Sequence, residues 1–335
     1  MSHHICRICG NPLDNTTYVA REMMFGYRDE FEYIECSRCD CLQISEIPEN
    51  LGKYYPNTYY SFAERRTPPD PALKRFLKRQ RNLWYLHRRS LVGRLVTSVL
   101  GPPQLPSWMK AAGLALDCRI LDVGCGTGDL LLWLRDQGCS RLTGVDAYID
   151  RDRFYSNGVR VFRAQLAELH ETFDFVMLHH SLEHMEDPAA VFRALQSRTR
   201  AGGLVLIRIP VVPSFAWREY RTDWVQLDAP RHLFLHSRKS IEMLSGATGF
   251  AIESVEYDST AFQFWGSEQY RRNIPLIDPR SVTGGGESVF TQEQLGEFAR
   301  RATELNRTGA GDQACFLLRR LDDGHRAPAA PAVRD

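Results

Sequence analysis

The strongest constraint on the fold is a regular alternation of strand-like and helix-like runs that begins near residue 118. Helical runs are expected at 128–138, 188–199 and 237–250. Strands that alternate with helices form a mostly parallel sheet with helices on both faces. The sequence therefore predicts an α/β, Rossmann-like fold with a seven-stranded sheet. The strands are expected at 119–123, 141–147, 159–164, 173–180, 202–211, 251–259 and 313–321.

Breaks in composition divide the rest of the chain. A cysteine-rich head and a tyrosine-rich connector occupy 1–64, and "RRTPPDP" at 65–71 predicts a linker. Apolar residues at helical spacing predict a helix over 72–97, within a helical linker region at 72–110. The sheet domain is expected at 111–322, and the Pro/Ala-rich segment 323–335 is expected to be disordered. Residues 271–300 resemble an insertion without an assigned structure.

Overall composition narrows the partners and the compartment. The 335 residues carry a net charge of +1, so no global basic field indicates a nucleic-acid partner. No apolar run is long enough to span a membrane, and "MSHHICRICG" lacks the apolar core of a signal peptide. An odd number of cysteines, nine, argues against a disulfide framework. We therefore expect a cytoplasmic protein, and no oligomeric state follows from the sequence.

The loop "LDVGCGTG" carries the first functional signal. It follows the first predicted strand directly, and ligands of open parallel sheets bind beyond the carboxyl ends of their strands. Its glycines stand at alternate positions, which fits neither the dinucleotide fingerprint nor a P-loop. Asp122, just before the loop, would repel a phosphate but can accept hydrogen bonds from a cationic amino group. Asp146 ends the next strand, where a carboxylate can bind both ribose hydroxyls. The expected ligand is a nucleoside that carries an amino acid.

The motifs now resemble those of the class I S-adenosylmethionine (SAM) dependent methyltransferases over about residues 118–258 and 313–321. "LDVGCGTG" looks like their first motif, "GVD" the second-strand acid, "FDFVMLHHSLEH" the fourth strand and "AGGLVLIRIP" the fifth. The resemblance implies a seventh strand that runs antiparallel to the others. It also implies SAM as cofactor. The expected SAM-binding residues are Asp122, Gly124, Cys125, Gly126 and Gly128 for the methionine part, Asp146 and Ala147 for the ribose, Gln165 and Leu166 near the adenine, and His179.

The head contains two C-x-x-C pairs, Cys6 with Cys9 and Cys36 with Cys39. Four thiolates in this pattern suit a tetrahedral zinc ion, and a site with four cysteine ligands has no open position. We therefore predict a structural Zn²⁺ in a zinc-ribbon-like module, which could not bury enough core to fold without it. Cys41 is either a spare thiol or an alternative ligand.

A zinc head, a "YYPNTYY" connector and this core together resemble zinc-containing methyltransferases of sugar and polysaccharide biosynthesis. Members of that family C-methylate nucleotide-linked deoxysugars, and a tyrosine from the head can reach their active site. The resemblance makes Tyr54, Tyr55, Tyr59 and Tyr60 candidates, with Tyr59 the one assigned to substrate. Packing of these tyrosines is an equal alternative.

The fourth predicted strand ends in "HHSLEHMEDP", beside the glycine loop. Methyl transfer needs a positioned acceptor and a group that removes its proton, and histidine does this near neutral pH. His184, Glu183, His180 and, from a later loop, His232 are the candidate catalytic residues. The sugar C-methyltransferases carry Tyr-x-Glu-His here, but this chain has Ser181 in place of the tyrosine and is expected to lack their further C-terminal domain. Both departures weigh against C-methylation. Alternatively, His184 caps the following helix.

The segment "FAWREYRTDWVQLDAPRHLFLHS" follows the fifth strand, where loops commonly cover the substrate. Asp228 is expected to bind a polar substrate, Arg231 a phosphate or carboxylate, and Trp224 a sugar or base by stacking. A packed lid with internal salt bridges is the alternative.

The segment 73–94 holds eight Lys and Arg residues and no acid. It could meet RNA, an anionic membrane surface or a nucleotide diphosphate, although a solvated face over an apolar stripe is commoner. The sequence as a whole predicts a methyltransferase that acts on a small molecule, most simply a nucleotide-linked or phosphorylated sugar. An RNA methyltransferase and a non-catalytic scaffold are the alternatives; the net charge weighs against the first and the intact glycine loop against the second.

Overall fold

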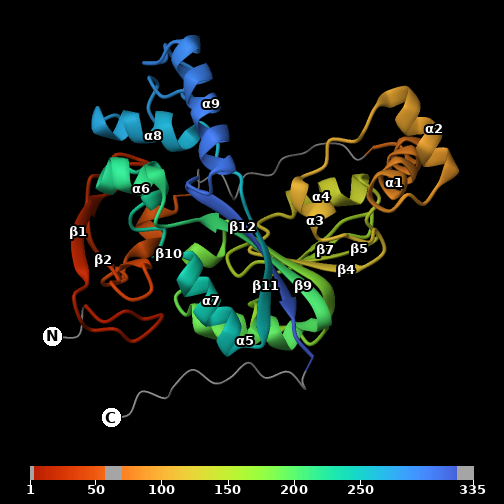
Figure 1. Ribbon diagram of the computed structural model, residues 1–335, viewed down its shortest axis with the longest axis horizontal. Coiled ribbons are helices and arrows are strands. Elements are labelled where there is room, and N and C mark those ends of the chain that lie inside the picture. The colour runs from red at the N-terminus through yellow and green to blue at the C-terminus, as the bar shows by residue number, and fades with distance from the viewer. Residues whose placement is uncertain (1–3, 57–69, 323–335) are drawn as a thin grey trace.

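The computed structural model describes residues 4–56 and 70–322, which form two sheets (Figure 1). The larger sheet has the order β11-β12-β9-β8-β4-β5-β7-β6. The seven predicted strands are all present, and the two-residue β6 (Arg153–Phe154) is an addition. The seven are β4 (Arg119–Val123), β5 (Arg141–Val145), β7 (Arg160–Phe162), β8 (Phe173–His179), β9 (Thr199–Pro210), β11 (Phe250–Tyr257) and β12 (Gln313–Arg320).

The predicted strand directions are confirmed. β8, β4, β5 and β7 pair in parallel, and β9 is parallel to β8. β12 lies between β11 and β9 and is antiparallel to both. The carboxyl ends of β4, β5 and β8 therefore meet at one edge of the sheet, where the glycine loop and the histidine cluster lie.

Helices cover both faces of this sheet, as the alternation predicts. α5 (Pro188–Arg198) and α7 (Arg238–Ala247) pack on one face, while α3 (Ser107–Ala111) and α4 (Asp129–Asp136) lie on the other (Figure 1). Each face has its own apolar core, built around Phe192 and Ile207 on one side and around Leu131 and Phe175 on the other. The sheet, and with it the edge where β4, β5 and β8 end, is thus packed between two layers of helices.

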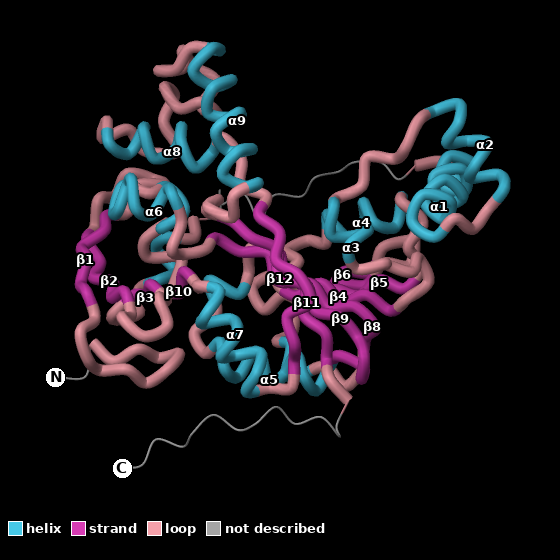
Figure 2. Tube along the Cα trace, viewed as in Figure 1, coloured by secondary structure: helices cyan, strands magenta, loops and turns pink. Residues whose placement is uncertain are grey.

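The N-terminal module is a small antiparallel sheet of β1 (Thr16–Arg21), β2 (Glu30–Glu35) and β3 (Leu42–Ile44), followed by the 3-10 turn η1 (Leu51–Tyr54). Figure 2 shows its short strands joined by long loops. Its fourth strand, β10 (Phe234–Leu235), comes from the segment after β9 and pairs with β3. The core of the module therefore includes residues from both sides of the expected boundary at residue 64.

The core of the module is shared with distant parts of the chain. α6 (Phe215–Tyr220), α8 (Phe262–Arg271) and α9 (Gln292–Arg307) pack on it through Trp217, Phe264 and Ala302. The unassigned segment 271–300 proves to be the end of α8, its connection and the start of α9. The segment after β9, expected to cover the substrate, is largely buried and includes the short turns η5 (Arg221–Asp223) and η6 (Val225–Leu227).

The helix predicted over 72–97 is wrong as a single element. The structure has a hairpin of α1 (Ala72–His87) and α2 (Leu91–Leu100). Arg88 has a positive φ of 56° and ends α1, and the Ser90 side chain caps α2 by accepting from the Gly93 amide at 2.9 Å. Gly93 lets the helices approach closely, because a β-carbon there would lie 1.9 Å from the Gln80 carbonyl oxygen.

Some expectations fall outside the described residues: Tyr59 and Tyr60, the linker except its last two residues, and the tail at 323–335. Within residues 4–56 and 70–322, no helix is both long and apolar enough to cross a membrane.

Candidate functional site

The glycine loop turns sharply at the end of β4. Gly124, Gly126 and Gly128 have φ values of 74°, 53° and 91°, which residues with a β-carbon rarely adopt. A β-carbon on Gly124 would also lie 2.5 Å from the β-carbon of Ser181. Ser181, where the C-methyltransferase pattern has tyrosine, donates its hydroxyl hydrogen to the Val123 carbonyl at 2.8 Å. Ser181 therefore packs against the start of the glycine loop and stabilises it.

Two carboxylates flank the loop. Asp122 is buried, and burial, followed by the nearby Asp146 carboxylate, raises its pKa to about 8. Asp146 accepts from the Gly126 amide at 2.9 Å and from the Tyr148 amide at 2.8 Å. Within residues 4–56 and 70–322 no cation pairs with Asp122, so this buried acid and the bare backbone beside it fit the ammonium group and the close approach of SAM. Asp146 keeps acceptor capacity for a ribose at the tip of β5.

The other residues expected to bind SAM surround this loop less directly. Ala147 follows Asp146 and is half-buried, and Gln165 caps η3 (Leu166–Glu168), in which Leu166 is buried. The Cys125 sulfur fills the space above Gly144 of β5, where a β-carbon would meet it at 2.5 Å. The side chain of Cys125 thus packs the loop onto β5. The backbone of Cys125, rather than its thiol, is the part that could contact a ligand.

The end of β8 gathers titratable groups. Glu183 is completely buried in η4 (Leu182–His184), and its Oε1 lies 3.4 Å from Nδ1 of His180. Burial alone would raise the pKa of Glu183, but the surrounding histidines outweigh it and hold the pKa at about 2. His179, tilted against Trp108, has its pKa lowered to about 3, chiefly by burial. Glu183 is therefore an anion and His179 neutral at ordinary pH.

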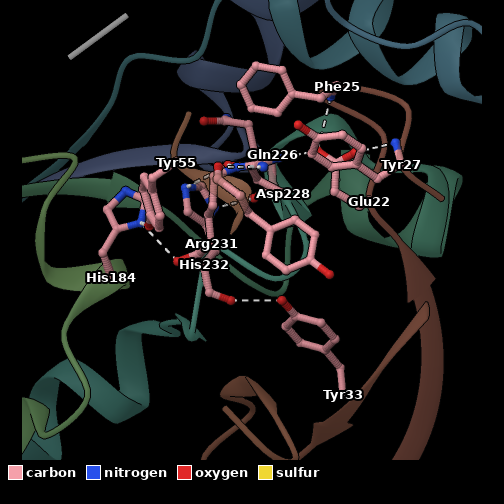
Figure 3. A network of polar contacts seen from close by, with 11 residues as sticks. Glu22, Phe25, Tyr27, Tyr33, Tyr55, His184, Gln226, Asp228, Arg231 and His232 are labelled. Atoms are coloured by element: carbon pink, nitrogen blue, oxygen red, sulfur yellow. Dashed lines mark hydrogen bonds and ion pairs between the residues drawn. The ribbon is translucent and has the colours of Figure 1, made fainter. Parts of the chain in front are cut away.

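His184 and His232 come together from η4 and the segment before β10, with ring centroids 4.8 Å apart (Figure 3). Nδ1 of His184 lies 2.9 Å from the Arg231 carbonyl and Nδ1 of His232 lies 2.7 Å from the Gln226 carbonyl. Because a carbonyl oxygen only accepts, both Nδ1 atoms carry the hydrogen, and both Nε2 atoms keep a lone pair. Burial first, and then His184, lowers the pKa of His232 to about 4.

These two histidines and Glu183 each offer an atom within 4.8 Å of the others, a set that could take up a proton or a metal ion. The alternative role of His184 as a helix cap is wrong, because Asp187 caps α5 by accepting from the Ala190 amide at 2.8 Å.

Arg231 occupies a different place from the one expected for a phosphate ligand. Its guanidinium is buried and bonds Asp228 at 2.6 Å and Glu22 at 3.0 Å, and it donates to the Tyr54 carbonyl at 3.2 Å (Figure 3). Asp228 is likewise paired within this ion cluster. Burial opposes its ionisation, but Arg231 lowers the pKa of Asp228. Arg231 and Asp228 thus fit the alternative prediction, a packed segment with internal salt bridges.

Trp224 is also a core residue rather than a stacking platform. It is fully buried beside Trp217, and its Nε1 donates to Asp312 at 2.9 Å. Its indole is therefore enclosed in the core that the N-terminal module shares with later segments.

The four paired cysteines converge, as their spacing predicts. Their sulfur atoms all lie within 4.8 Å of one another, with 3.5 Å between Cys6 and Cys39 and between Cys9 and Cys36. A tetrahedron of sulfurs about 2.3 Å from zinc has edges of about 3.8 Å, so the set fits such an ion. Cys41 is not one of the converging four; it is buried, with its thiol 3.8 Å from the Leu42 carbonyl.

Several residues that hold the candidate site together carry no recognisable signal in the local sequence. Glu22 binds Arg231 across 209 positions, and Tyr33 donates to the His232 carbonyl at 2.9 Å across 199. Both belong to the N-terminal module. Of the two candidate tyrosines that lie in the described residues, Tyr54 and Tyr55, the hydroxyl of Tyr55 reaches His184, at 3.2 Å from Nδ1.

Comparison with known proteins supports the assignment of this fold. The family described as "Methyltransferase domain" matches residues 65–255. A ubiquinone biosynthesis O-methyltransferase of Aeromonas salmonicida is 35% identical over 109 residues, which cover 29% of this chain and 45% of that protein. One of Bordetella avium is 31% identical over 171 residues, 46% of this chain and 70% of that protein.

Among solved structures, an S-adenosylmethionine dependent methyltransferase from Mesorhizobium loti aligns with a TM-score of 0.38 and 22% identity, covering 64% of this chain and 96% of that one. The chain spans about half the length of the first curated relatives it matches. From its match to the family and its strand order, the chain belongs to the methyltransferase-domain family and has the fold of the class I SAM-dependent methyltransferases.

Proposed function

We propose that this chain transfers a methyl group from SAM to a small polar acceptor at the carboxyl ends of β4 and β8. One observation carries the proposal: a glycine loop flanked by buried Asp122 and by Asp146 lies against an end of β8 that presents His184 and Glu183.

SAM, when bound, supplies a methyl group on a positively charged sulfur. Asp122 and the backbone of Gly124, Gly126 and Gly128 would hold its methionine part, and Asp146 its ribose. The proposed surroundings of the nucleoside remain Ala147, Gln165 and Leu166. His179, also proposed near SAM, is buried and neutral. The low pKa of His179 prevents a second positive charge beside the cofactor.

The acceptor must lose a proton as it takes the methyl group, and His184 is placed to receive it. Nδ1 of His184 is fixed by the Arg231 carbonyl, so the lone pair of Nε2 is the basic atom. The anionic Glu183 stabilises the imidazolium that results, and the neighbouring His232, which stays neutral, adds no opposing charge. His180, beside Glu183 and half-exposed, connects this pair to solvent.

We propose a nucleotide-linked or phosphorylated sugar as the acceptor, on the resemblance of the cysteine head and of Glu183–His184 to sugar methyltransferases. Because Arg231 and Asp228 neutralise each other, a phosphate would be bound by other groups. A hydroxyl of an aromatic ring is the second candidate, favoured by the identity with proteins named for O-methylation in ubiquinone biosynthesis.

We further propose that the four cysteines hold a structural Zn²⁺. Sulfur–sulfur distances of 3.5 Å support a tetrahedral ion, and four thiolates leave no position for a substrate. All nine cysteines lie in the described residues and none of them forms a disulfide, which supports the cytoplasm as the compartment.

The experiment uses SAM with a labelled methyl group, incubated separately with nucleotide sugars, catechol-type phenols and RNA. Label in the sugars, lost in His184→Ala but not in the exposed His4→Ala, supports the first candidate. Label in the phenols supports the second. Label in RNA overturns the acceptor class, and an absence of label together with an absence of SAM binding supports a scaffold.

A further inference from the structure

We propose that the α1–α2 hairpin, residues 72–100, docks the chain peripherally on an anionic lipid membrane. The hairpin lies at the end of the molecule opposite the N-terminal module, outside α4 (Figure 1). It is an interaction surface that the proposed methyl transfer does not use.

The outward face of α2 is apolar and exposed. Leu91, Leu95 and Val99 are 81%, 67% and 75% exposed, and their four-residue spacing places them on one face. Gly93, which packs on α1, lies on the opposite face. Val92 beside this stripe is 47% exposed. So large an apolar surface on a single ten-residue helix marks an interaction site rather than scattered surface residues.

The Lys and Arg residues around this face are not accompanied by acidic residues in the same stretch of sequence. Residues 71–116 contain no Asp or Glu. Arg88 and Arg89 are exposed in the turn directly before Leu91, and the Arg88 and Arg94 guanidiniums lie 5.3 and 5.9 Å from the Trp84 ring centroid. Lys74 and Lys78 are paired with Asp70, whereas among the described residues no carboxylate pairs with Arg88, Arg89 or Arg94 beside the apolar stripe.

An apolar stripe edged by arginines fits the interface of an anionic bilayer, where the aliphatic side chains enter the acyl boundary and the arginines meet lipid phosphates. RNA would meet the arginines but leave the leucines and valine in water. A second copy of the same face would bring arginines against arginines. Charge complementarity therefore favours a lipid surface over both.

The inner side of the hairpin is hydrogen-bonded to the sheet domain, so docking of the hairpin would hold the whole domain at the membrane. Asn82 donates to the Gln137 carbonyl at 2.7 Å, Arg79 donates to the Gly138 carbonyl at 3.1 Å, and the His87 ring donates to the Leu114 carbonyl at 2.9 Å. The outward face of α2 can thus bind a membrane without unfolding the body.

The test is co-sedimentation of the full chain with vesicles of phosphatidylcholine alone or mixed with phosphatidylglycerol. The wild type is expected to bind the mixed vesicles, with affinity falling as salt is added. Leu91→Ser/Leu95→Ser/Val99→Ser should lower the affinity at least about tenfold. Arg88→Gln/Arg89→Gln should lower it by roughly fivefold for each arginine. The matched control is Phe154→Ser/Ile277→Ser, which removes two exposed apolar residues elsewhere and should bind as the wild type does.

Several results would overturn the proposal. These are failure to bind mixed vesicles at low salt, or equal losses in the control and in the α2 variant. RNA binding that survives the serine substitutions but not Arg88→Gln/Arg89→Gln would reassign the surface to RNA, and a dimer abolished by the serine substitutions would reassign it to self-association. Unchanged SAM binding in the variants separates each outcome from misfolding and from failure of the proposed catalysis.

Discussion

The hydroxyl of Tyr55 lies 3.2 Å from Nδ1 of His184, although the two residues are 129 positions apart. The same Nδ1 lies 2.9 Å from the Arg231 carbonyl. The N-terminal module and the segment before β10 therefore orient one imidazole together. The module thus contributes a contact to the candidate site.

Replacing Tyr55 by phenylalanine removes one of these two contacts. We expect the methyl transfer rate of Tyr55→Phe to fall roughly tenfold, while SAM affinity is unchanged, since among the described residues only the Arg231 carbonyl then remains as a hydrogen-bond partner of His184 Nδ1. Tyr54→Phe is the control, because its hydroxyl binds Asp29 inside the module at 2.6 Å. Equal effects of the two substitutions in a labelled-methyl assay would show that only packing matters.

Gly124→Ala should abolish SAM binding through a specific collision. The added β-carbon would meet that of Ser181 at 2.5 Å and displace the loop. Gly113→Ala is matched to it, with a φ of 55° but nothing within 4 Å of the added atom. Both variants should lose about 1–2 kcal/mol of stability from the positive φ. Only Gly124→Ala should lose SAM affinity; retention of full affinity would exclude this loop as the binding site.

Removal of the proposed Zn²⁺ should disturb the candidate site as well as the module. We expect one Zn²⁺ per chain by elemental analysis, and its loss in Cys36→Ser but not in Cys118→Ser. Ser237 donates to the Cys39 carbonyl, and β10 pairs with β3, so loosening the four cysteines frees the segment that carries His232. Methyl transfer should be lost together with zinc. Full activity of a zinc-free Cys36→Ser protein would contradict this coupling.

Acidification should destabilise the fold through buried His236. Burial lowers the pKa of His236 to about 4, and its Nε2 has no hydrogen-bond partner among the described residues. Since the unfolded imidazole titrates near 6.5, this stability is fully present above about pH 6.5 and is lost as pH falls toward about 4.

Between about pH 7 and about pH 5.5, His236 should account for about 1 kcal/mol of lost unfolding free energy, measured in urea. His236→Gln should remove that part of the pH dependence, whereas the exposed His4→Gln should leave it intact. Parallel pH profiles for the wild type and His236→Gln would refute the assignment.

Local signals in the sequence predicted the sheet because each strand is a short apolar run and each turn has its own glycine or proline. The glycine loop and the two C-x-x-C pairs are readable for the same reason: their chemistry lies within a few residues. Nothing local shows that β10 would join the module, or that Arg231 would find Glu22. A buried arginine and a substrate-binding one look alike in sequence, and only tertiary pairing distinguishes them.

The most direct test is a calorimetric titration of SAM into the zinc-loaded chain near pH 7, in buffers of different ionisation enthalpy. With the pKa of Asp122 raised to about 8, this carboxyl is mostly protonated before binding, and a bound cation would ionise it. The expected result is one SAM per chain, with nearly one proton released and no release in a weaker-binding Asp122→Asn. Absence of SAM binding by the folded wild type would contradict the account.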